Sequence, residues 1–437
     1  MGLGGGSFTS TDKILPGSYI NFISSVGADE VFANRGVVAM PLVLDWGIDG
    51  QVIEVSANTF QSQAKGIFGY SYLDDKLKGI ADLFKNASKA YFYRLVKSGV
   101  KATNTFGSAT CFGLRGNDIT IIISINVEDA GKMDVSTLLD GENVDGQTVA
   151  SASELVDNDF VVFDTGATLA QTAGLAMSGG SNGDTVTGAE YSAFLAMIEP
   201  YRFNVLGCLA LDDTIKDLFV AFTKRMRDDN GIKFQTVVYK RESSDYEGII
   251  SIDNETLTSG ALASSLVYWT AGVIAGVLIN QSVTNKAYDG QFEVDINYTI
   301  DALEGAVAAG KFIFHRVGNE VRVLTDINTL LTFSAEKTKD FSKNQTIRCI
   351  DQVGNDIAYL FNTKYLGLKA NDNASRVGLW SDIVSYHRQL ADIGAIEGFS
   401  ASDVVVSQGD DKTKVIISDT ITPISAMEQL YMTVIVQ

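Results

Sequence analysis

Residues that favour β-strands follow one another without interruption near the carboxyl end of the chain, within residues 424–437 (ISAMEQLYMTVIVQ). From 431 to 436 they alternate between two faces and include no charge, glycine or proline, which predicts a strand. An apolar strand at a chain end needs a partner. It either completes a sheet of its own chain or adds itself to the sheet edge of a neighbouring subunit, and the pattern leaves both open.

A second isolated apolar segment lies near the amino end. Residues 1–13 are rich in Gly, Ser and Thr, and Pro16 and Gly17 introduce a short strand-like stretch at 18–24 (SYINFIS). We therefore expect extended apolar segments on both sides of the folded body.

Buried strands and amphipathic helices alternate between these two segments. Continuous apolar runs predict strands at 36–44, 52–55 and 89–95, and apolar positions at the helical period predict a helix at 74–86. The order helix, strand, helix, strand then follows at 191–198, 203–209, 213–229 and 234–239. Such alternation implies parallel pairing through right-handed crossovers.

Short β-rich pieces interrupt this alternation between about residues 100 and 176. Residues 119–127 and 160–163 are predicted strands, with acidic turns between them. This pattern of short strands and acidic turns indicates a small acidic β-domain inserted between elements of a larger domain.

The remaining part of the chain continues both kinds of element. Strands are predicted at 248–252, 292–296, 311–315 and 320–324, helices at 300–309 and 377–393, and a β-hairpin at 404–407 with 414–418. Residues 261–279 carry no charge, but they contain Ser264, Ser265 and Thr270 and have no flanking basic cluster. We interpret them as a helix buried on all sides and not as a membrane span.

These elements predict a multidomain α/β (α+β) protein. Its mixed α/β core carries an inserted small β-rich domain and extended amino- and carboxyl-terminal β-strand arms. The predicted divisions are an arm at 1–24, core at 25–99, insertion at 100–178, core at 179–345, a carboxyl-terminal domain at 346–420 and an arm at 421–437.

Charge excludes some partners. The chain has 34 Lys and Arg against 53 Asp and Glu, a net charge of −19, so nucleic acid is a poor partner. Residues 102–180 hold 2 basic and 11 acidic residues, whereas 311–390 hold 11 basic and 8 acidic. Opposite-signed regions suit self-association, although a solvated acidic face explains the first region equally well.

The chemistry-bearing residues do not form a recognisable active site. Cys111, Cys208 and Cys349 are widely separated in mostly apolar settings, which predicts reduced, buried thiols in a cytoplasmic protein without disulfides or a metal. The stretch 305–311 (GAVAAGK) matches most of a phosphate loop. Phe312 stands where Ser or Thr should bind magnesium, however, and the predicted order is helix then strand.

Two other motifs also fail. Residues 179–183 (GGSNG) fit a nucleophile elbow with Ser181 as nucleophile, but no helix starts directly after it, and the histidines, His315 and His387, suit packing positions. Asp140, Glu142 and Asp145 lack the spacing of a calcium loop. We therefore assign no catalytic, cofactor-binding or metal-binding residue and predict that the chain is not an enzyme.

Short motifs follow one another along almost the whole chain: 16–20 (PGSYI), 116–119 (GNDI), 177–183, 280–285 (NQSVTN) with Tyr288 and Gly290, 326–329 (DINT), 341–344 (FSKN) with Arg348, and Pro423, Ala426, Met427, Glu428, Tyr431 and Thr433. In this order they together resemble the tail sheath protein of contractile phage tails and of related phage-tail-like bacteriocins of the R type.

The resemblance implies a structural role. Sheath subunits of this family stack as hexameric rings around an inner tail tube and contract from an extended, metastable state to drive the tube through a cell envelope. The implied partners are further copies of the chain, the tube protein, and the baseplate and tail terminator proteins, with neither nucleic acid nor membrane insertion. Assembly in the bacterial cytoplasm, followed by incorporation into a phage tail or a released bacteriocin particle, is implied as well.

The resemblance also implies which residues join subunits. The amino-terminal arm would use Tyr19, Ile20, Phe22 and Ile23, and the carboxyl-terminal arm Leu430, Tyr431, Met432, Thr433, Val434, Ile435 and Val436. The hairpin that accepts them would use Val404, Val405, Val406, Val415, Ile416 and Ile417. Charged contacts to other subunits or the tube are expected from Arg316, Arg322, Lys337, Lys339, Lys343, Arg348 and Arg388, and the 377–393 helix is expected to face the tube.

Two alternatives stay open on the sequence. One is a soluble α/β hydrolase that uses Ser181, and the other is a static surface-lattice protein that polymerises without contracting.

Overall fold

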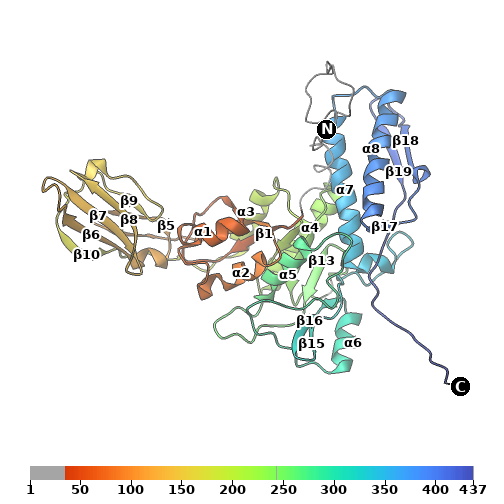
Figure 1. Ribbon diagram of the computed structural model, residues 1–437, viewed down its shortest axis with the longest axis horizontal. Helices are drawn as coiled ribbons and strands as arrows, with labels where there is room; N and C mark the ends of the chain where they lie inside the picture. The colour runs from red at the N-terminus through yellow and green to blue at the C-terminus, as the bar shows by residue number, and fades with distance from the viewer. Residues whose placement is uncertain (1–34, 243, 437) are drawn as a thin grey trace, which may run out of the picture. The chain divides into compact units, whose positions relative to one another are not determined.

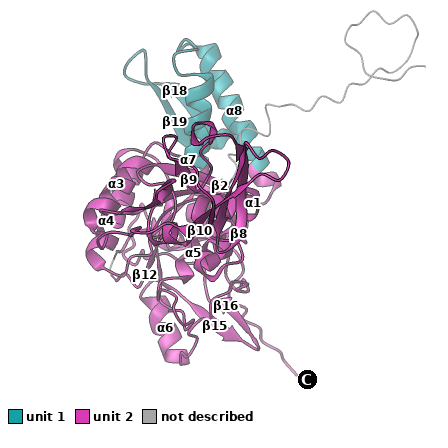
Figure 2. Ribbon diagram, turned by 90° about the vertical axis from the view of Figure 1, so that its left-hand side faces the viewer, with its two compact units in different colours: residues 1–34, 353–389, 400–420 teal, residues 35–352, 390–399, 421–437 magenta. Residues whose placement is uncertain are grey.

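The computed structural model describes residues 35–242 and 244–436, so the predicted amino-terminal arm lies outside the described residues. The described chain divides into two compact units (Figure 2). The larger unit comprises residues 35–352, 390–399 and 421–437, and the smaller comprises 353–389 and 400–420. Each unit is described by itself below.

A seven-stranded sheet in the order β14-β13-β12-β11-β1-β3-β2 organises the larger unit. Neighbouring strands are parallel throughout, except that the edge strand β2 runs antiparallel to β3. The strands are β1 (Val37–Leu42), β2 (Val52–Ser56), β3 (Lys89–Arg94), β11 (Val205–Gly207), β12 (Gln235–Tyr239), β13 (Ile249–Ile252) and β14 (Lys311–Phe312). The predicted parallel α/β core is thereby confirmed.

Helices cover both faces of this sheet (Figure 1). One apolar core joins the sheet to α1 (Ala57–Phe68), α2 (Lys78–Phe84) and α5 (Leu266–Gly276), and the other joins it to α3 (Gly188–Ile198) and α4 (Asp213–Lys224). Strand β1 serves both cores, because Val38 and Met40 point to the first and Ala39 to the second. A strand buried on both faces reads as a continuous apolar run, which is why β1 was predictable.

Helix α5 is the buried helix predicted from the charge-free segment. Nine of its residues, among them Trp269 and Thr270, are buried. Gly272 and Gly276 let it lie against the carbonyl oxygens of Leu83 and Asn86, where a Cβ would fall at 2.4 and 1.8 Å. Within the described part of the chain, no helix is both long and apolar enough to cross a membrane.

The insertion is a β-sandwich that leaves the main sheet after β3 and returns with β11. Its two sheets have the orders β10-β6-β7-β8 and β4-β5-β9. The strands are β4 (Lys101–Asn104), β5 (Gly107–Phe112), β6 (Ile119–Ile125), β7 (Met133–Leu139), β8 (Glu142–Val149), β9 (Val161–Phe163) and β10 (Thr172–Ala176). They enclose a core of their own, in which Ile121, Val135 and Val161 are buried. The inserted β-rich domain is therefore confirmed.

The rest of the larger unit holds small elements. These are α6 (Ile300–Ala308), the antiparallel pair β15 (Phe314–Val317) and β16 (Glu320–Val323), and the antiparallel pair β17 (Ile396–Glu397) and β20 (Thr422–Pro423). The strand predicted at 292–296 is wrong, because only Val294 forms an isolated bridge there, to Thr256.

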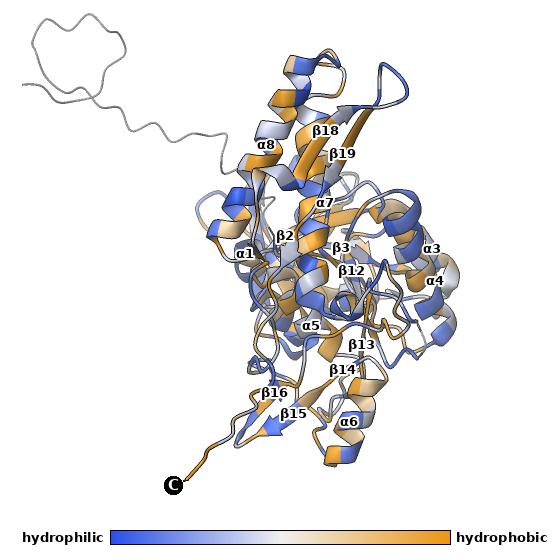
Figure 3. Ribbon diagram, turned by 90° about the vertical axis from the view of Figure 1, so that its right-hand side faces the viewer, coloured by the Kyte–Doolittle hydropathy of each residue, from blue (hydrophilic) through white to orange (hydrophobic). Residues whose placement is uncertain are grey.

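The smaller unit consists of two helices and a hairpin. Helix α7 (Asn344–Lys364), which the sequence analysis did not predict, enters it at residue 353, and α8 (Asn373–Asp392) is the predicted amphipathic helix. Strands β18 (Val404–Gln408) and β19 (Val415–Asp419) form the predicted antiparallel hairpin, with Val404 opposite Asp419 (Figure 3). The hairpin is held to α8 by two bonds, from Trp380 Nε1 to the Val404 carbonyl at 2.9 Å and between His387 Nε2 and Asp419 Oδ2 at 2.7 Å.

Candidate functional site

The carboxyl-terminal arm joins no sheet among the described residues. Residues 424–436 form no strand and run away from the larger unit as an extended segment (Figure 1). The hydrophobic side chains from Leu430 to Val436 are 69 to 90% exposed. Apolar side chains with β-strand character are thus held in solvent in the isolated subunit. The sequence left open whether the arm completes a sheet of its own chain or adds to the sheet edge of a neighbouring subunit. The described residues of this chain provide no such sheet partner.

The arm leaves the larger unit at Glu428. Its carboxylate accepts hydrogen bonds from Thr284 Oγ1 at 2.9 Å and Thr325 Oγ1 at 3.3 Å and pairs with the Lys343 ammonium. Just before it, the Ala426 amide donates to Gln345 Oε1 at 3.0 Å. We call the three donors Thr284, Thr325 and Lys343, together with Glu428, the anchor.

A buried polar cluster lies behind the anchor. Arg348 Nη2 donates to Asp326 Oδ2 at 2.9 Å, and their side chains are 0 and 1% exposed. The same carboxyl group accepts from Asn344 Nδ2 at 2.9 Å and from the Val283 amide at 3.1 Å. Arg348 Nη2 also donates to the Gln281 carbonyl at 2.9 Å. These bonds tie the loop after α5, the loop after β16 and the first turn of α7 into one structure.

The scattered segments that carried the family resemblance therefore meet in space. Residues 280–285, 326–329 and 341–344, together with Arg348 and Glu428, all contribute to the anchor or to the cluster behind it. The sequence pattern identified these residues but did not predict that they touch. Their separations, up to 144 positions for Thr284 and Glu428, left no local signal of the contact.

Of the charged residues expected on the surface, one is buried and another is half-buried in an ion pair within its own chain. Arg348 is buried in its ion pair with Asp326, so its assignment as a contact to other subunits or to the tube is wrong. Lys343 is occupied by Glu428 of its own chain. Removal of Arg348 would leave the Asp326 carboxylate buried without a counter-ion, which is costly.

The other charged candidates lie on the surface of their units. Arg322 donates to Glu320 and to the Asn285 carbonyl, and Lys337 Nζ donates to Glu247 Oε1 at 2.7 Å, so both are partly neutralised. Arg316, Lys339 and Arg388 are exposed. Their role in contacts with other molecules stays a prediction.

The predicted acceptor hairpin has unpaired edges. Strands β18 and β19 form a sheet of two strands, so within the described residues the outer edge of each strand lacks a ladder partner. Val405 and Ile416 are each 55% exposed on the outward face. On the other face Val404 is buried, and Val406, Val415 and Ile417 are partly buried. A short apolar strand could extend this sheet on either edge.

The catalytic motifs are structural. Ser181 lies in an isolated antiparallel bridge with Val100, and its Oγ accepts from the Gly183 amide at 3.1 Å, so it is not at a strand-to-helix elbow. Residues 305–311 run from the end of α6 into β14, as the sequence order predicted. His315 lies half-buried in β15, and burial lowers its pKa below the ordinary value.

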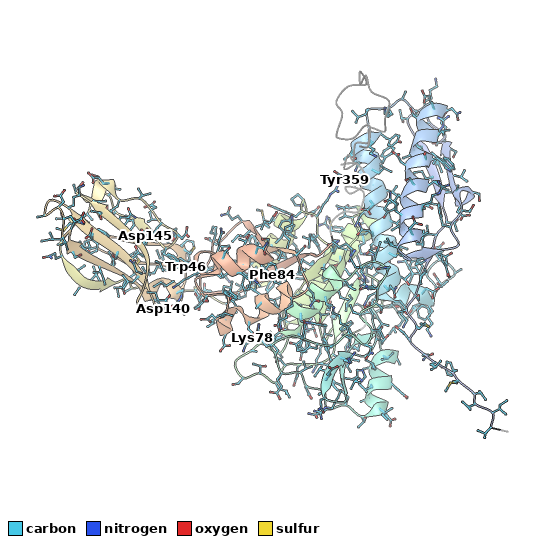
Figure 4. The ribbon with its side chains drawn as sticks, in the orientation of Figure 1. Trp46, Lys78, Phe84, Asp140, Asp145 and Tyr359 are labelled. Atoms are coloured by element: carbon cyan, nitrogen blue, oxygen red, sulfur yellow. The ribbon has the colours of Figure 1, made fainter. Side chains whose placement is uncertain are left out.

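The acidic turn is also accounted for. Asp140 and Asp145 both lie in the sandwich (Figure 4). Arg115 Nη1 donates to Asp140 Oδ1 at 2.7 Å and holds the pKa of that carboxyl below its ordinary value, while Asp145 accepts from Asn158 Nδ2 at 2.9 Å. Over the residues that the structure describes, no group of three or more potential ligands could hold a metal ion. Cys111, Cys208 and Cys349 are free and buried, as predicted.

The described chain is thus a multidomain α/β protein with an inserted β-sandwich and an exposed carboxyl-terminal arm. Four family models match in order along the chain. They describe the tail sheath protein Gp18 domain III N-terminal region at 35–95, the phage tail sheath protein beta-sandwich domain at 97–182, its central domain at 184–329 and the phage tail sheath C-terminal domain at 336–437. The chain belongs to the phage tail sheath protein family, whose members are structural.

Individual relatives agree with this assignment. The phage-like element PBSX protein XkdK of Bacillus subtilis is 33% identical, over 99% of this chain and 99% of its own. The sheath tail protein DSY3957 of Desulfitobacterium hafniense is 37% identical in its crystal structure, with a TM-score of 0.82 over 95% of this chain and 99% of its own. The helical sheath of the anti-feeding prophage in its contracted state shares the fold, with 11% identity and a TM-score of 0.57 over 97% of this chain and 99% of its own.

Proposed function

We propose that this chain is the subunit of a contractile sheath. Copies of it stack as hexameric rings around an inner tube and contract from an extended, metastable state to drive the tube through a target envelope. The observation that carries the proposal is the exposed apolar arm at 430–436, together with a hairpin in the same chain, since among the described residues neither the arm nor the two outer hairpin edges has a strand partner.

The arm of one subunit adds to the hairpin of another. Hydrogen bonds along an added strand contribute about 1 kcal/mol each. Burial of side chains such as Tyr431 and Ile435, which are 87 and 82% exposed in the isolated chain, adds about 1.5 to 3 kcal/mol each. The amino-terminal arm at 18–24 occupies the second edge, so each hairpin joins three subunits.

Contraction requires two packings of the folded bodies with different contacts. The exposed charges of Arg316, Lys339 and Arg388 belong to such contacts, with acidic surfaces of neighbouring subunits or with the tube. Extended arms keep the subunits connected because they bend while the bodies slide and rotate. The protein works without enzymatic activity or a cofactor, and its further partners are the baseplate and tail terminator proteins.

The proposal places the subunit in a bacterial particle. It assembles in the cytoplasm of the producing cell and leaves as part of a phage tail or of a released phage-tail-like bacteriocin.

Deletion of residues 430–437 tests the proposal. The full chain should form tubes or rings at high concentration in negative-stain micrographs, and the truncated chain should remain a folded monomer with the same unfolding temperature. Tubes formed by the truncated chain would overturn the role of the arm. Tubes of a single length and width under all triggers would instead favour a static lattice.

A further inference from the structure

We propose that Glu428 is a clamp that fixes where the donated arm begins and passes tension on the arm into the α/β core. This inference rests on the proposed exchange of arms and goes beyond it, because it assigns a positioning role to a residue that is bound by its own subunit.

The clamp is made by three separate segments. Thr284 follows α5, Thr325 follows β16 and Lys343 immediately precedes α7, and all three converge on one carboxylate. The Glu428 side chain is only 24% exposed, although the arm around it lies in solvent. Hydrogen bonds to a charged acceptor are stronger than neutral ones, so these contacts stabilise the position of the chain at Glu428.

For the residues directly before and after Glu428, the structure describes no hydrogen bond to the body of the larger unit. Met427 is fully exposed, at 101%, and Gln429 Oε1 accepts only from Tyr431 within the arm, at 3.1 Å. Upstream, the β17–β20 ladder pairs only two residues of each strand. Tension applied at 430–436 therefore reaches the body first at Glu428.

The clamp is backed by the buried cluster. Thr284 Oγ1 accepts from the Asp326 amide at 3.0 Å, and Asn344, next to Lys343 in the chain, donates to the Asp326 carboxyl at 2.9 Å. Asp326 is in turn held by the buried guanidinium of Arg348. The donors of the clamp are thus preorganised, and force is transmitted into the sheet and helices instead of peeling the arm away.

A fixed exit point also determines the register of the donated strand. The eight residues from 429 to 436 reach about 26 Å when extended, at ~3.3 Å each. A slip by one residue would turn every side chain of the arm to the opposite face of the acceptor sheet. Loss of the clamp would lengthen the free arm and lower its effective concentration at the acceptor.

The test compares Glu428→Ala in the full chain with Met427→Ala, its exposed neighbour, as the matched control. Glu428→Ala should raise the critical concentration for tube assembly by about tenfold, equivalent to ~1.4 kcal/mol, while Met427→Ala should leave it unchanged. Both monomers should keep the unfolding temperature of the original chain. Lys343→Glu should impair assembly like Glu428→Ala, and the combination with Glu428→Lys should restore it.

The outcomes separate this inference from the proposed function. If deletion of 430–437 abolishes tubes but Glu428→Ala assembles like the original chain, the clamp is refuted and the arm exchange stands. If the deletion itself forms tubes, the proposed function fails first. Should Glu428→Ala lower the unfolding temperature, Thr325→Val, which removes the hydroxyl donor to Glu428 at 3.3 Å and leaves the bonds to Asp326 in place, decides the question by the same assembly measurement.

Discussion

Arg348 in the first turn of α7 pairs with Asp326 in the loop after β16, with 2.9 Å between Nη2 and Oδ2 and both side chains buried. Asp326 directly follows Thr325, and Arg348 lies in the helix that Lys343 precedes. The pair therefore joins the two segments that carry these two donors to Glu428. It is a structural contact within the subunit, whereas the sequence suggested that Arg348 faces other molecules.

Removal of one partner should be costly. Arg348→Leu leaves the Asp326 carboxylate buried without its counter-ion, so the free energy of unfolding should fall by about 3 to 5 kcal/mol. Urea denaturation followed by circular dichroism measures the change. Arg316→Leu, at an exposed position in β15, is the control and should change the free energy by less than about 0.5 kcal/mol. Equal effects of the two substitutions would contradict the structural role.

The same substitution at two helical glycines should have opposite effects. Gly276→Ala places a Cβ 1.8 Å from the Asn86 carbonyl oxygen, so repacking should cost about 1 to 3 kcal/mol. Gly305→Ala in α6 meets no atom within 4 Å and should stabilise the protein by about 0.4 to 1 kcal/mol, since it restricts the unfolded chain. Differential scanning calorimetry of both variants tests the close packing of α5, and a stable Gly276→Ala would refute it.

The three cysteine thiols should be unreactive in the native protein. Burial raises the pKa of Cys208 to about 12 and that of Cys349 to about 11, and it also raises the pKa of Cys111. A thiol reagent at pH 8 should therefore modify none of them until denaturant is added. Rapid modification of the folded chain would place at least one thiol at the surface.

These raised pKa values make stability depend on alkaline pH. The unfolded chain loses its thiol protons near pH 8.5 to 9, whereas folded Cys208 keeps its proton up to about pH 12. The contribution is complete below the unfolded pKa and is lost as the pH rises toward the folded pKa. Urea midpoints should fall between pH 9 and 12, and Cys208→Ala should make the decline shallower. An identical decline in this variant would assign the effect to other groups.

A charge within the arm should block assembly without affecting folding. Ile435 is 82% exposed, so Ile435→Asp should leave the unfolding temperature unchanged. Placed in an acceptor sheet, the carboxylate would be desolvated, and tubes should fail to form. Ile435→Val is the matched control and should assemble. Negative-stain microscopy and sedimentation distinguish the two variants, and tubes of Ile435→Asp would show that this side chain is not buried on assembly.

The local pattern of apolar and polar residues was sufficient to predict an element wherever that pattern fits one kind of secondary structure. Strand β1, helix α5 and the β18–β19 hairpin were predicted because continuous apolar runs and a polar turn require no knowledge of distant residues. Helix α7 was missed although the buried residues Cys349, Val353 and Leu360 are spaced for one face of a helix, since amide and acidic residues are interspersed among them.

The wrong strand at 292–296 shows how side chains override a pattern. The Phe292 amide donates to Tyr288 Oη at 3.2 Å and the Glu293 amide to Thr258 Oγ1 at 2.8 Å. Both donors are thus used by side-chain oxygens and cannot form a ladder. The sequence spacing gave no indication of these partners.

By itself, the sequence determined the alternation of the carboxyl-terminal strand, the charge-free helix and the set of residues that resembles the sheath family. Local periodicity and composition encode these features, which depend only on neighbouring residues. The tertiary structure alone decided that the strand finds no partner among the described residues and that Thr284, Thr325 and Lys343 meet at Glu428. Such contacts join residues 85 to 144 positions apart, and only the folding of the whole chain brings them together.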